Sequence, residues 1–150
     1  MIVLAEISDG NLLTELALTS KAFWGYDANL VESWRKDLTV TSKMIEERMV
    51  FKFLQDEKIA GFYMLNPPKG KQIELEMLFV LPGFIGKGIG KKLLLHSFEK
   101  AKKLNAISMT LLADPNAEKF YKSQGFKVID KKESSVKNRF LPVMQKYLIQ

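Results

Sequence analysis

The 150-residue chain contains no cysteine and a single histidine, His96. Without thiols it can form neither disulfides nor zinc fingers, and it has no cysteine nucleophile. With one histidine, a multi-histidine metal site is hard to build, so no metal is implied. Proline and glycine are also scarce, with 5 and 9 residues, while 47% of the chain is hydrophobic. This composition indicates a folded globular protein rather than a low-complexity disordered one.

Long hydrophobic runs are absent as well. Charged residues interrupt every apolar stretch before it reaches the ~20 residues that a bilayer requires, so we expect no membrane association. Residues Met1 to Asp9 lack the basic start and apolar segment of a signal peptide. The chain also has no repeat and no Ser/Gly-rich linker. We therefore expect a cytoplasmic protein with a single domain over residues 1–150.

Positive charge is in excess, with 23 basic against 17 acidic residues, a formal net charge of +6 and a pI of about 9.4. A basic surface favours polyanionic partners such as nucleic acid, anionic membranes or phosphorylated ligands. It can also serve solubility alone. The charge by itself leaves these alternatives open.

Apolar periodicity and turn residues predict alternating helices and strands, and hence an α/β or α+β fold with a mixed sheet. In the strand that ends at Val80, we expect Ile73, Leu75, Met77 and Phe79 to share one face. The expected helices span about 12–22, 28–38, 90–104 and 115–124, and the expected strands 49–54, 59–65, 73–80, 107–112, 126–129 and 141–149.

The segment from Leu78 to Lys92 carries the strongest functional signal. A strand ends, glycines follow at alternate positions (Gly86, Gly88, Gly90), and a helix begins at once. Glycines let the backbone turn sharply and approach a ligand closely. The first turn of a helix offers unpaired N–H groups and the positive end of the helix dipole. Together these features predict a cradle for phosphate or pyrophosphate.

Three common phosphate loops do not fit this segment. A P-loop would need glycine at Ile85 and a hydroxyl residue at Lys92. The dinucleotide fingerprint would need glycine at Lys91. The stretch Gly83–Gly86 matches the GxxG of a KH module, but that loop joins two helices, whereas this one follows a strand.

The stretch Ile85-Gly-Lys-Gly-Ile-Gly90 instead resembles the Gln/Arg-x-x-Gly-x-Gly/Ala motif of the GNAT acyltransferases, although Ile85 replaces the first residue. Residues 117–126 resemble the same family's Ala-x-x-Phe-Tyr-x-x-x-Gly-Phe signature, and the resemblance covers about residues 73–129. It implies a mixed, mostly antiparallel central sheet flanked by helices. The fourth and fifth strands of that sheet splay apart to form a cleft for acetyl-CoA.

The resemblance also implies roles for individual residues. Tyr121 matches the family tyrosine that protonates the departing thiolate, and its reference pKa of about 10 keeps it protonated at neutral pH. The family asparagine usually lies seven residues before that tyrosine, where this chain has Asp114, so Asn116 is an alternative contact. The implied acetyl-CoA-binding residues are Leu78, Phe79, Val80, Ile85, Gly86, Lys87, Gly88, Ile89, Gly90, Lys91, Asn116 and Tyr121.

Glu74 stands six residues before Val80, which is the spacing of the general base in the histone-modifying branch of the family. Glu76 is its rival, two residues on. For the acceptor, the family's variable regions point to Trp24 and Tyr26 and to the loop with Ser134, Ser135 and Arg139. Arg139 is a candidate to hold an acceptor carboxylate. We read His96, in mid-helix, as structural.

These residues lead to the hypothesis of an N-acetyltransferase that moves an acetyl group directly from acetyl-CoA to a primary amine. The acceptor would be a small molecule or a peptide, and the oligomeric state, a homodimer included, is left open. One alternative is a catalytically inactive coenzyme A sensor. Another is a basic nucleic-acid-binding protein, against which stands the lack of a strip of aromatic and basic residues.

Overall fold

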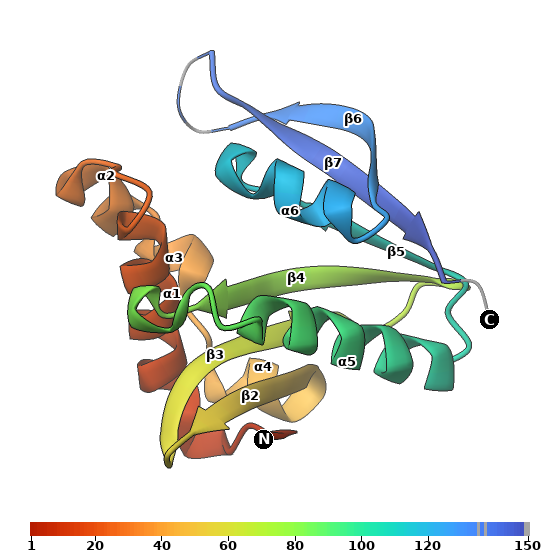
Figure 1. Cartoon of the computed structure of the whole chain (residues 1–150), viewed down its shortest axis with the longest axis horizontal. Helices are drawn as coiled ribbons and strands as arrows, with labels where there is room; N and C mark the ends of the chain where they lie inside the picture. Colours follow the sequence, from red (N-terminus) through yellow and green to blue (C-terminus); the bar gives the residue numbers. More distant parts are fainter. Residues whose placement is uncertain (135, 137, 149–150) are drawn as a thin grey trace.

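The structure is a computed structural model that describes residues 1–134, 136 and 138–148. Its centre is a seven-stranded sheet in the order β1-β2-β3-β4-β5-β7-β6 (Figure 1). Strands β4 and β5 run parallel, and the other neighbouring pairs of described strands are antiparallel. The strands are β1 Ile2–Leu4, β2 Met49–Gln55, β3 Lys58–Leu65, β4 Gln72–Val80, β5 Ser108–Leu112, β6 Lys127–Glu133 and β7 Phe140–Tyr147. The helices are α1 Gly10–Ala22, α2 Ala28–Ser33, α3 Arg35–Leu38, α4 Ser42–Glu47, α5 Ile89–Lys103 and α6 Glu118–Ser123, with short 3-10 turns η1 Ile7–Asp9, η2 Pro82–Phe84 and η3 Pro115–Ala117.

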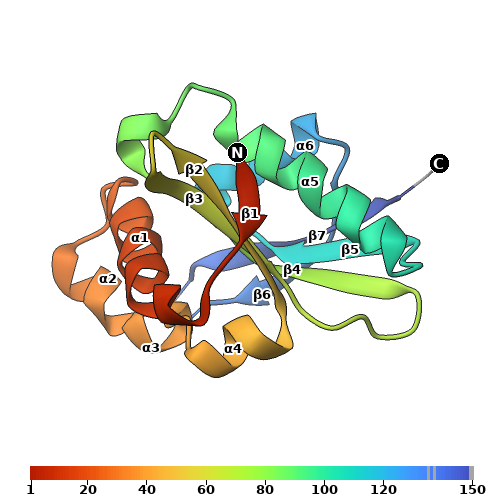
Figure 2. The same cartoon turned by 90° about the horizontal axis from the view of Figure 1, so that it is seen from below.

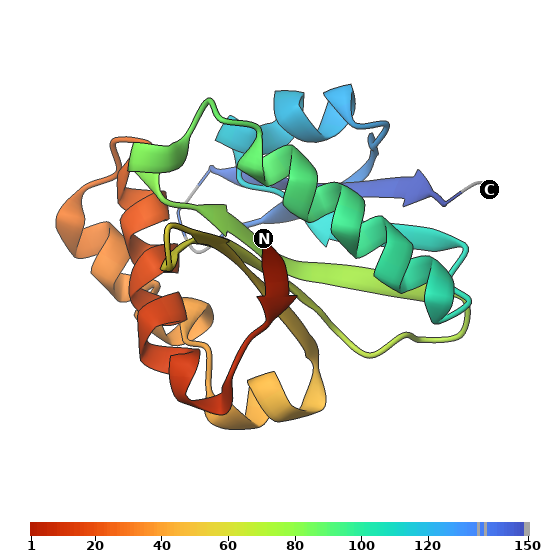
Figure 3. The same cartoon turned by 60° about the horizontal axis from the view of Figure 1, so that its bottom comes forward.

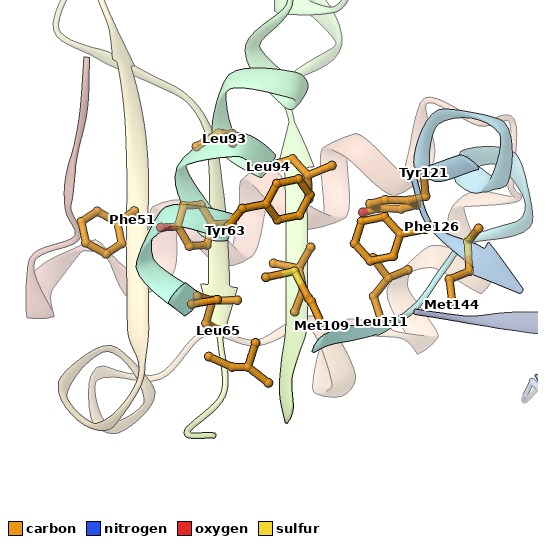
Figure 4. Close-up of a cluster of buried hydrophobic side chains, with 14 of the residues drawn as sticks. Phe51, Tyr63, Leu65, Leu93, Leu94, Met109, Leu111, Tyr121, Phe126 and Met144 are labelled. Atoms are coloured by element: carbon orange, nitrogen blue, oxygen red, sulfur yellow. The ribbon is translucent and has the colours of Figure 1, made fainter. Parts of the chain in front are cut away.

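Helices cover both faces of the sheet (Figures 2 and 3). Along β3 the side chains alternate between two cores, as the period of a strand requires. Phe62 and Met64 pack with the helices α1 to α4, whereas Tyr63 and Leu65 pack with α5. Figure 4 shows this second core, which reaches from Phe51 to Tyr121. The expected mixed α/β fold is confirmed.

The parallel pair β4–β5 is joined over only part of its length. The register between these strands runs from Gln72–Ser108 to Glu74–Thr110 and then stops. On its other side, β4 stays paired with β3 as far as Val80. The two strands therefore separate, and Figure 1 shows β4 and β5 converging near the C-terminus and diverging toward α1. This is the splayed pair that the sequence resemblance implied.

A β-bulge changes the faces of β4. Met64 lies opposite Met77 while Leu65 lies opposite Leu75, which leaves Glu76 as the extra residue. The prediction that Ile73, Leu75, Met77 and Phe79 share a face is therefore wrong. The first two pack in the α5 core, whereas Met77 and Phe79 pack against the core of α1 to α4.

Several predicted boundaries also need correction. The helix expected over 28–38 is two short helices, because Trp34 adopts φ −90° and ψ 0° and its N–H bonds to Val31, three residues back. Helix α4 was not predicted, since its six residues bury a single apolar side chain, Ile45. The strand expected at 126–129 extends to Glu133, and the last strand is described as far as Tyr147. Residue 149, the predicted end of that strand, lies outside the described residues.

Candidate active site

The gap between β4 and β5 forms a cleft of about 430 Å³. One wall is the second half of β4, and the opposite wall is the end of β5 with η3 and α6. The C-terminal end of α1 and the turn before α5 complete it. The lining residues are Ser20, Lys21, Trp24, Leu75, Glu76, Met77, Leu78, Phe79, Val80, Phe84, Ile85, Gly86, Gly88, Ile89, Gly90, Lys91, Leu111, Leu112, Ala113, Asp114, Asn116, Ala117, Phe120 and Tyr121.

The edge of β4 presents backbone groups to this cleft. The N–H of Leu81 donates to the carbonyl of Ala60 on β3, at 2.8 Å. Because successive residues of a strand direct their backbone polar groups to opposite sides, Phe79 also faces β3. Leu78 and Val80 then direct their N–H and C=O groups away from β3, toward the side that β5 has left. A ligand in the cleft can pair with them as an added strand would.

The turn before α5 has the geometry that the glycine pattern predicted. Gly86 and Gly88 adopt φ values of +87° and +75°, a left-handed region that favours glycine, and Gly88 is the N-cap of α5. A Cβ on Gly90 would lie 3.7 Å from Phe120 and 3.8 Å from Val80, inside the cleft. The free N–H groups at the start of α5 therefore lie at one end of the cleft, where they can bind an anion.

Of the two lysines predicted to bind acetyl-CoA, Lys87 and Lys91, one lines the cleft. Lys91, in the first turn of α5, is among the lining residues. Lys87 is outside that set, and its Nζ lies 5.3 Å from the ring centre of Phe84. Lys91 can add positive charge to the N–H groups of the turn, and Lys87 contributes charge only from outside the cleft wall.

Tyr121, from α6, is buried and lines the cleft. Its ring packs edge-on against Phe126 with centroids 5.6 Å apart, and Figure 4 shows its hydroxyl on the side turned toward β4. Among the described residues, no side chain or backbone group is hydrogen-bonded to that hydroxyl. Burial raises the pKa of Tyr121 well above its ordinary value, so the hydroxyl keeps its proton at neutral pH.

The two glutamates of β4 differ in position. Glu76, the bulge residue, lines the cleft, whereas Glu74 lies outside the lining set, where β4 is still paired with β5. Asn66 connects them, because its Nδ2 donates to Glu74 Oε1 at 2.9 Å and to Glu76 Oε2 at 3.2 Å. The structure therefore places Glu76, and not Glu74, at the cleft.

Opposite β4, the cleft wall holds a polar cluster around Asp114. Asp114 accepts hydrogen bonds from Lys21 Nζ at 2.7 Å, Arg139 Nη2 at 3.1 Å and the Tyr26 hydroxyl at 3.1 Å. It also caps η3 by accepting from the backbone N–H and the Nδ2 of Asn116, both at 2.9 Å. The cluster ties α1, the α1–α2 loop and the β6–β7 loop to the end of β5.

The cluster shifts two pKa values in opposite directions. Burial alone would raise the pKa of Asp114, but the hydrogen bond and charge of Lys21 and the bonds from Asn116 lower it below its ordinary value. Burial raises the pKa of Tyr26, and the hydrogen bond from Arg139 offsets this only in part. Asp114 is therefore a carboxylate and Tyr26 a neutral phenol at neutral pH.

The predicted acceptor residues are thus partly brought together. Trp24 lines the cleft, while Tyr26 and Arg139 lie behind it, joined by a 2.8 Å hydrogen bond. Ser134 lies in the β6–β7 loop, and Ser135 is outside the described residues. His96 is half-buried on α5, with its ring 4.7 Å from that of Phe51 and its Nδ1 2.7 Å from the Tyr63 hydroxyl. Lys21 was missed because nothing in its local sequence marks a partner 93 residues away.

Two structural features are absent from the described part of the chain, a membrane-spanning helix and a metal-binding cluster. No helix there is long and apolar enough to cross a membrane. Likewise, residues 1–134, 136 and 138–148 contain no group of three or more His, Cys, Asp or Glu side chains that could hold a metal ion.

Comparison with known proteins decides the family. Residues 18–148 match the family described as "Acetyltransferase (GNAT) domain". The chain belongs to the GNAT acetyltransferases. No curated protein matches its sequence with significance.

Solved GNAT structures share the whole fold. The PaiA N-acetyltransferase from Thermoplasma acidophilum, in complex with coenzyme A, is 25% identical, with 98% of each chain covered and a TM-score of 0.82. The ribosomal-protein-S18-alanine N-acetyltransferase from Escherichia coli is 17% identical, with 100% of this chain and 94% of that chain covered and a TM-score of 0.75. YncA from Salmonella typhimurium, with its cofactor acetyl-CoA, is 18% identical, with the same coverage and a TM-score of 0.72. At such low identity, the last two show the fold alone.

Proposed function

We propose that this GNAT protein transfers an acetyl group from acetyl-CoA directly to a primary amine. The observation that carries the proposal is the coincidence, in one cleft, of an unpaired β4 edge and a glycine turn at the start of α5. The first suits the amide-rich pantetheine arm and the second suits pyrophosphate. The structural similarity to a coenzyme A complex at 25% identity supports the same ligand.

Each part of acetyl-CoA then has its own group of protein contacts. Backbone N–H groups from Gly86 to Gly90 hold the pyrophosphate, and Lys91 adds a positive charge. Leu78 and Val80 pair with the pantetheine arm through their backbone. The backbone N–H of Leu78, which is closer than Val80 to the bulge at Glu76, can stabilise the negative charge that develops on the thioester oxygen.

Two side chains handle protons. Acetyl-CoA supplies the activated acetyl group as a thioester. A C–N bond forms to the acceptor amine while the C–S bond breaks. One proton leaves the nitrogen for Glu76, directly or through water, and one passes from Tyr121 to the sulfur. We assign the base to Glu76 rather than to Glu74 because Glu76 alone of the two lines the cleft. Neither a metal nor a covalent enzyme adduct enters this scheme.

The raised pKa of Tyr121 is compatible with proton donation. Taken alone, it makes the phenol a weak acid toward a thiolate. However, the sulfur would lie in the same desolvated cleft, where burial raises the pKa of a thiol too. Both anions are disfavoured there, so the transfer is less uphill than reference values suggest.

The test compares two buried tyrosines. Tyr121→Phe removes a hydroxyl from the cleft, and we expect kcat to fall by about 10²-fold or more, the usual effect of losing a general acid. Tyr63→Phe is the matched control, because its hydroxyl lies outside the cleft lining and contacts His96. It should lower stability by ~1 kcal/mol and leave kcat unchanged. Thiol release from acetyl-CoA can be followed with a thiol reagent without background, since the protein has no cysteine.

An amine library supplies the acceptors for this assay. Turnover that is lost in Tyr121→Phe and kept in Tyr63→Phe supports the proposal. Equal activity of both variants would remove Tyr121 from the mechanism. If the protein binds coenzyme A but acetylates no amine, it is a coenzyme A sensor instead.

A further inference from the structure

The cluster around Asp114 contains more positive than negative charge. Lys21 and Arg139 both pair with this one carboxylate, and Tyr26 is neutral. The side chains of Lys21, Arg139 and Asp114 are only 16%, 17% and 8% exposed. Among the described residues, neither cation has another carboxylate within 4 Å. The cluster therefore holds one uncompensated positive charge in a partly buried place, where charges are normally paired.

Asp114 has no capacity left to balance the second cation. Its Oδ2 accepts from Lys21, Tyr26 and Arg139, and its Oδ1 accepts from Tyr26 and from two N–H groups of Asn116. Lys21 and Arg139, by contrast, can still donate further hydrogen bonds. Lys21 Nζ makes one hydrogen bond, and Arg139 uses Nη2 alone, so in the described part of the chain Nε and Nη1 have no partner.

Aromatic rings hold both cations in place. The Arg139 guanidinium lies 5.0 Å from the ring centre of Tyr26 and 5.2 Å from that of Trp34. The ammonium of Lys21 lies 5.6 Å from the Trp34 ring centre. Such packing fixes the donors before a ligand arrives, which reduces the entropy lost on binding.

From this cluster we propose that the acceptor is an amine that also carries a carboxylate. The inference rests on the proposed function. The carboxylate of the acceptor pairs with Lys21, which lines the cleft, while Arg139 contributes its positive charge from behind the cleft wall. Its amine is directed toward Glu76 on the opposite wall. Trp24, which lines the cleft at the end of α1, supplies an apolar surface for the acceptor side chain.

Binding of reaction products tests the carboxylate without depending on turnover. The probes are N-acetylglycine, N-acetyl-β-alanine and N-acetyl-leucine, each paired with its primary amide and titrated into the coenzyme A-saturated protein. We expect at least one acid to bind about 10-fold or more tightly than its amide. Equal binding within every pair would overturn the inference. If the acids bind but the free amino acids are not acetylated, the proposed function fails and the carboxylate site stands.

Variants that change the charge of the cluster separate recognition of the carboxylate from nonspecific effects of a substitution. Lys21→Met makes the cluster neutral, so the preference for acid over amide should disappear. Lys21→Met with Asp114→Asn restores the net charge of +1 and should restore part of that preference, which keeps the test valid if the single variant folds poorly. Lys36→Met, on the exposed side of α3, is the control cation and should keep it.

Kinetics distinguish a second explanation of the same charge. If Lys21 and Arg139 instead stabilise negative charge during the reaction, Lys21→Met will lower kcat equally for amino acids and amino acid amides. That result, together with an unchanged preference in binding, would contradict the proposal. A loss confined to the acids, seen in kcat/KM, would support it.

Discussion

Gly90→Ala should raise the stability of the protein and weaken its binding of coenzyme A. Gly90 lies in the first turn of α5 with a helical conformation, so alanine introduces no backbone strain. Its Cβ would meet Phe120 and Val80 at 3.7 and 3.8 Å, which are ordinary contact distances. Alanine is favoured over glycine in helices by about 0.5–1 kcal/mol. For a chain of this size, such a gain raises Tm by about 2 °C.

The same methyl group occupies cleft space that we assign to the pyrophosphate. If it displaces one hydrogen bond between a backbone N–H and a phosphate oxygen, the loss is about 1.5–3 kcal/mol. Coenzyme A should then bind about 10- to 100-fold more weakly. Calorimetric titration measures the affinity, and thermal unfolding without ligand measures the stability.

Gly83→Ala is the matched control for this variant. Gly83 belongs to η2, its Cβ would meet open space, and it does not line the cleft. The control should leave the affinity unchanged and can raise Tm by about as much as Gly90→Ala does, because alanine at an unstrained position reduces the entropy of the unfolded chain. Unchanged affinity in Gly90→Ala would refute the assignment of the pyrophosphate to this turn.

Three further predictions concern the glycine turn before α5, the pKa of His96 and the ion pair between Lys52 and Asp9. Gly88→Ala should lower the free energy of unfolding by about 1–2 kcal/mol, because alanine is strained at φ +75°. A smaller loss, measured by urea unfolding, would contradict this prediction. Burial, with Lys100 and Lys103 nearby, lowers the pKa of His96 below its ordinary value of 6.5. The free energy of unfolding should therefore fall as the pH drops from the unfolded-state pKa of His96 to its folded-state pKa. NMR titration of this single histidine measures the folded-state pKa, and a value at or above 6.5 would contradict the prediction. Lys52→Met should cost about 3 kcal/mol, because it leaves Asp9 buried without the lysine 2.7 Å away, and a cost under about 1 kcal/mol by urea unfolding would contradict it.

The elements that depend on local chemistry could be predicted from the sequence. The glycine spacing at 86, 88 and 90 located the turn and the start of α5, because the positive φ values of Gly86 and Gly88 favour glycine. Asp114 followed by Pro115 marked the start of η3, and Gly125 the end of α6. These signals act over a few residues, so no tertiary information was required.

The features that depend on distant contacts could not be predicted. The bulge at Glu76 exists because of the pairing between β4 and β3, and it decides which glutamate reaches the cleft. The ion pair between Lys21 and Asp114 joins residues 93 positions apart. Trp34 interrupts a stretch whose apolar spacing suits one continuous helix, and its packing under Lys21 and Arg139 depends on the β6–β7 loop.

The most direct measurement of the central claim is an amide NMR titration of the protein with coenzyme A. We expect the largest shifts at the backbone N–H groups of Leu78, Val80 and residues 86–90. No response of these amides, or shifts that fall instead around the second hollow, of about 640 Å³ and lined in part by Asp9 and Lys52, would contradict the assignment of the cleft to coenzyme A.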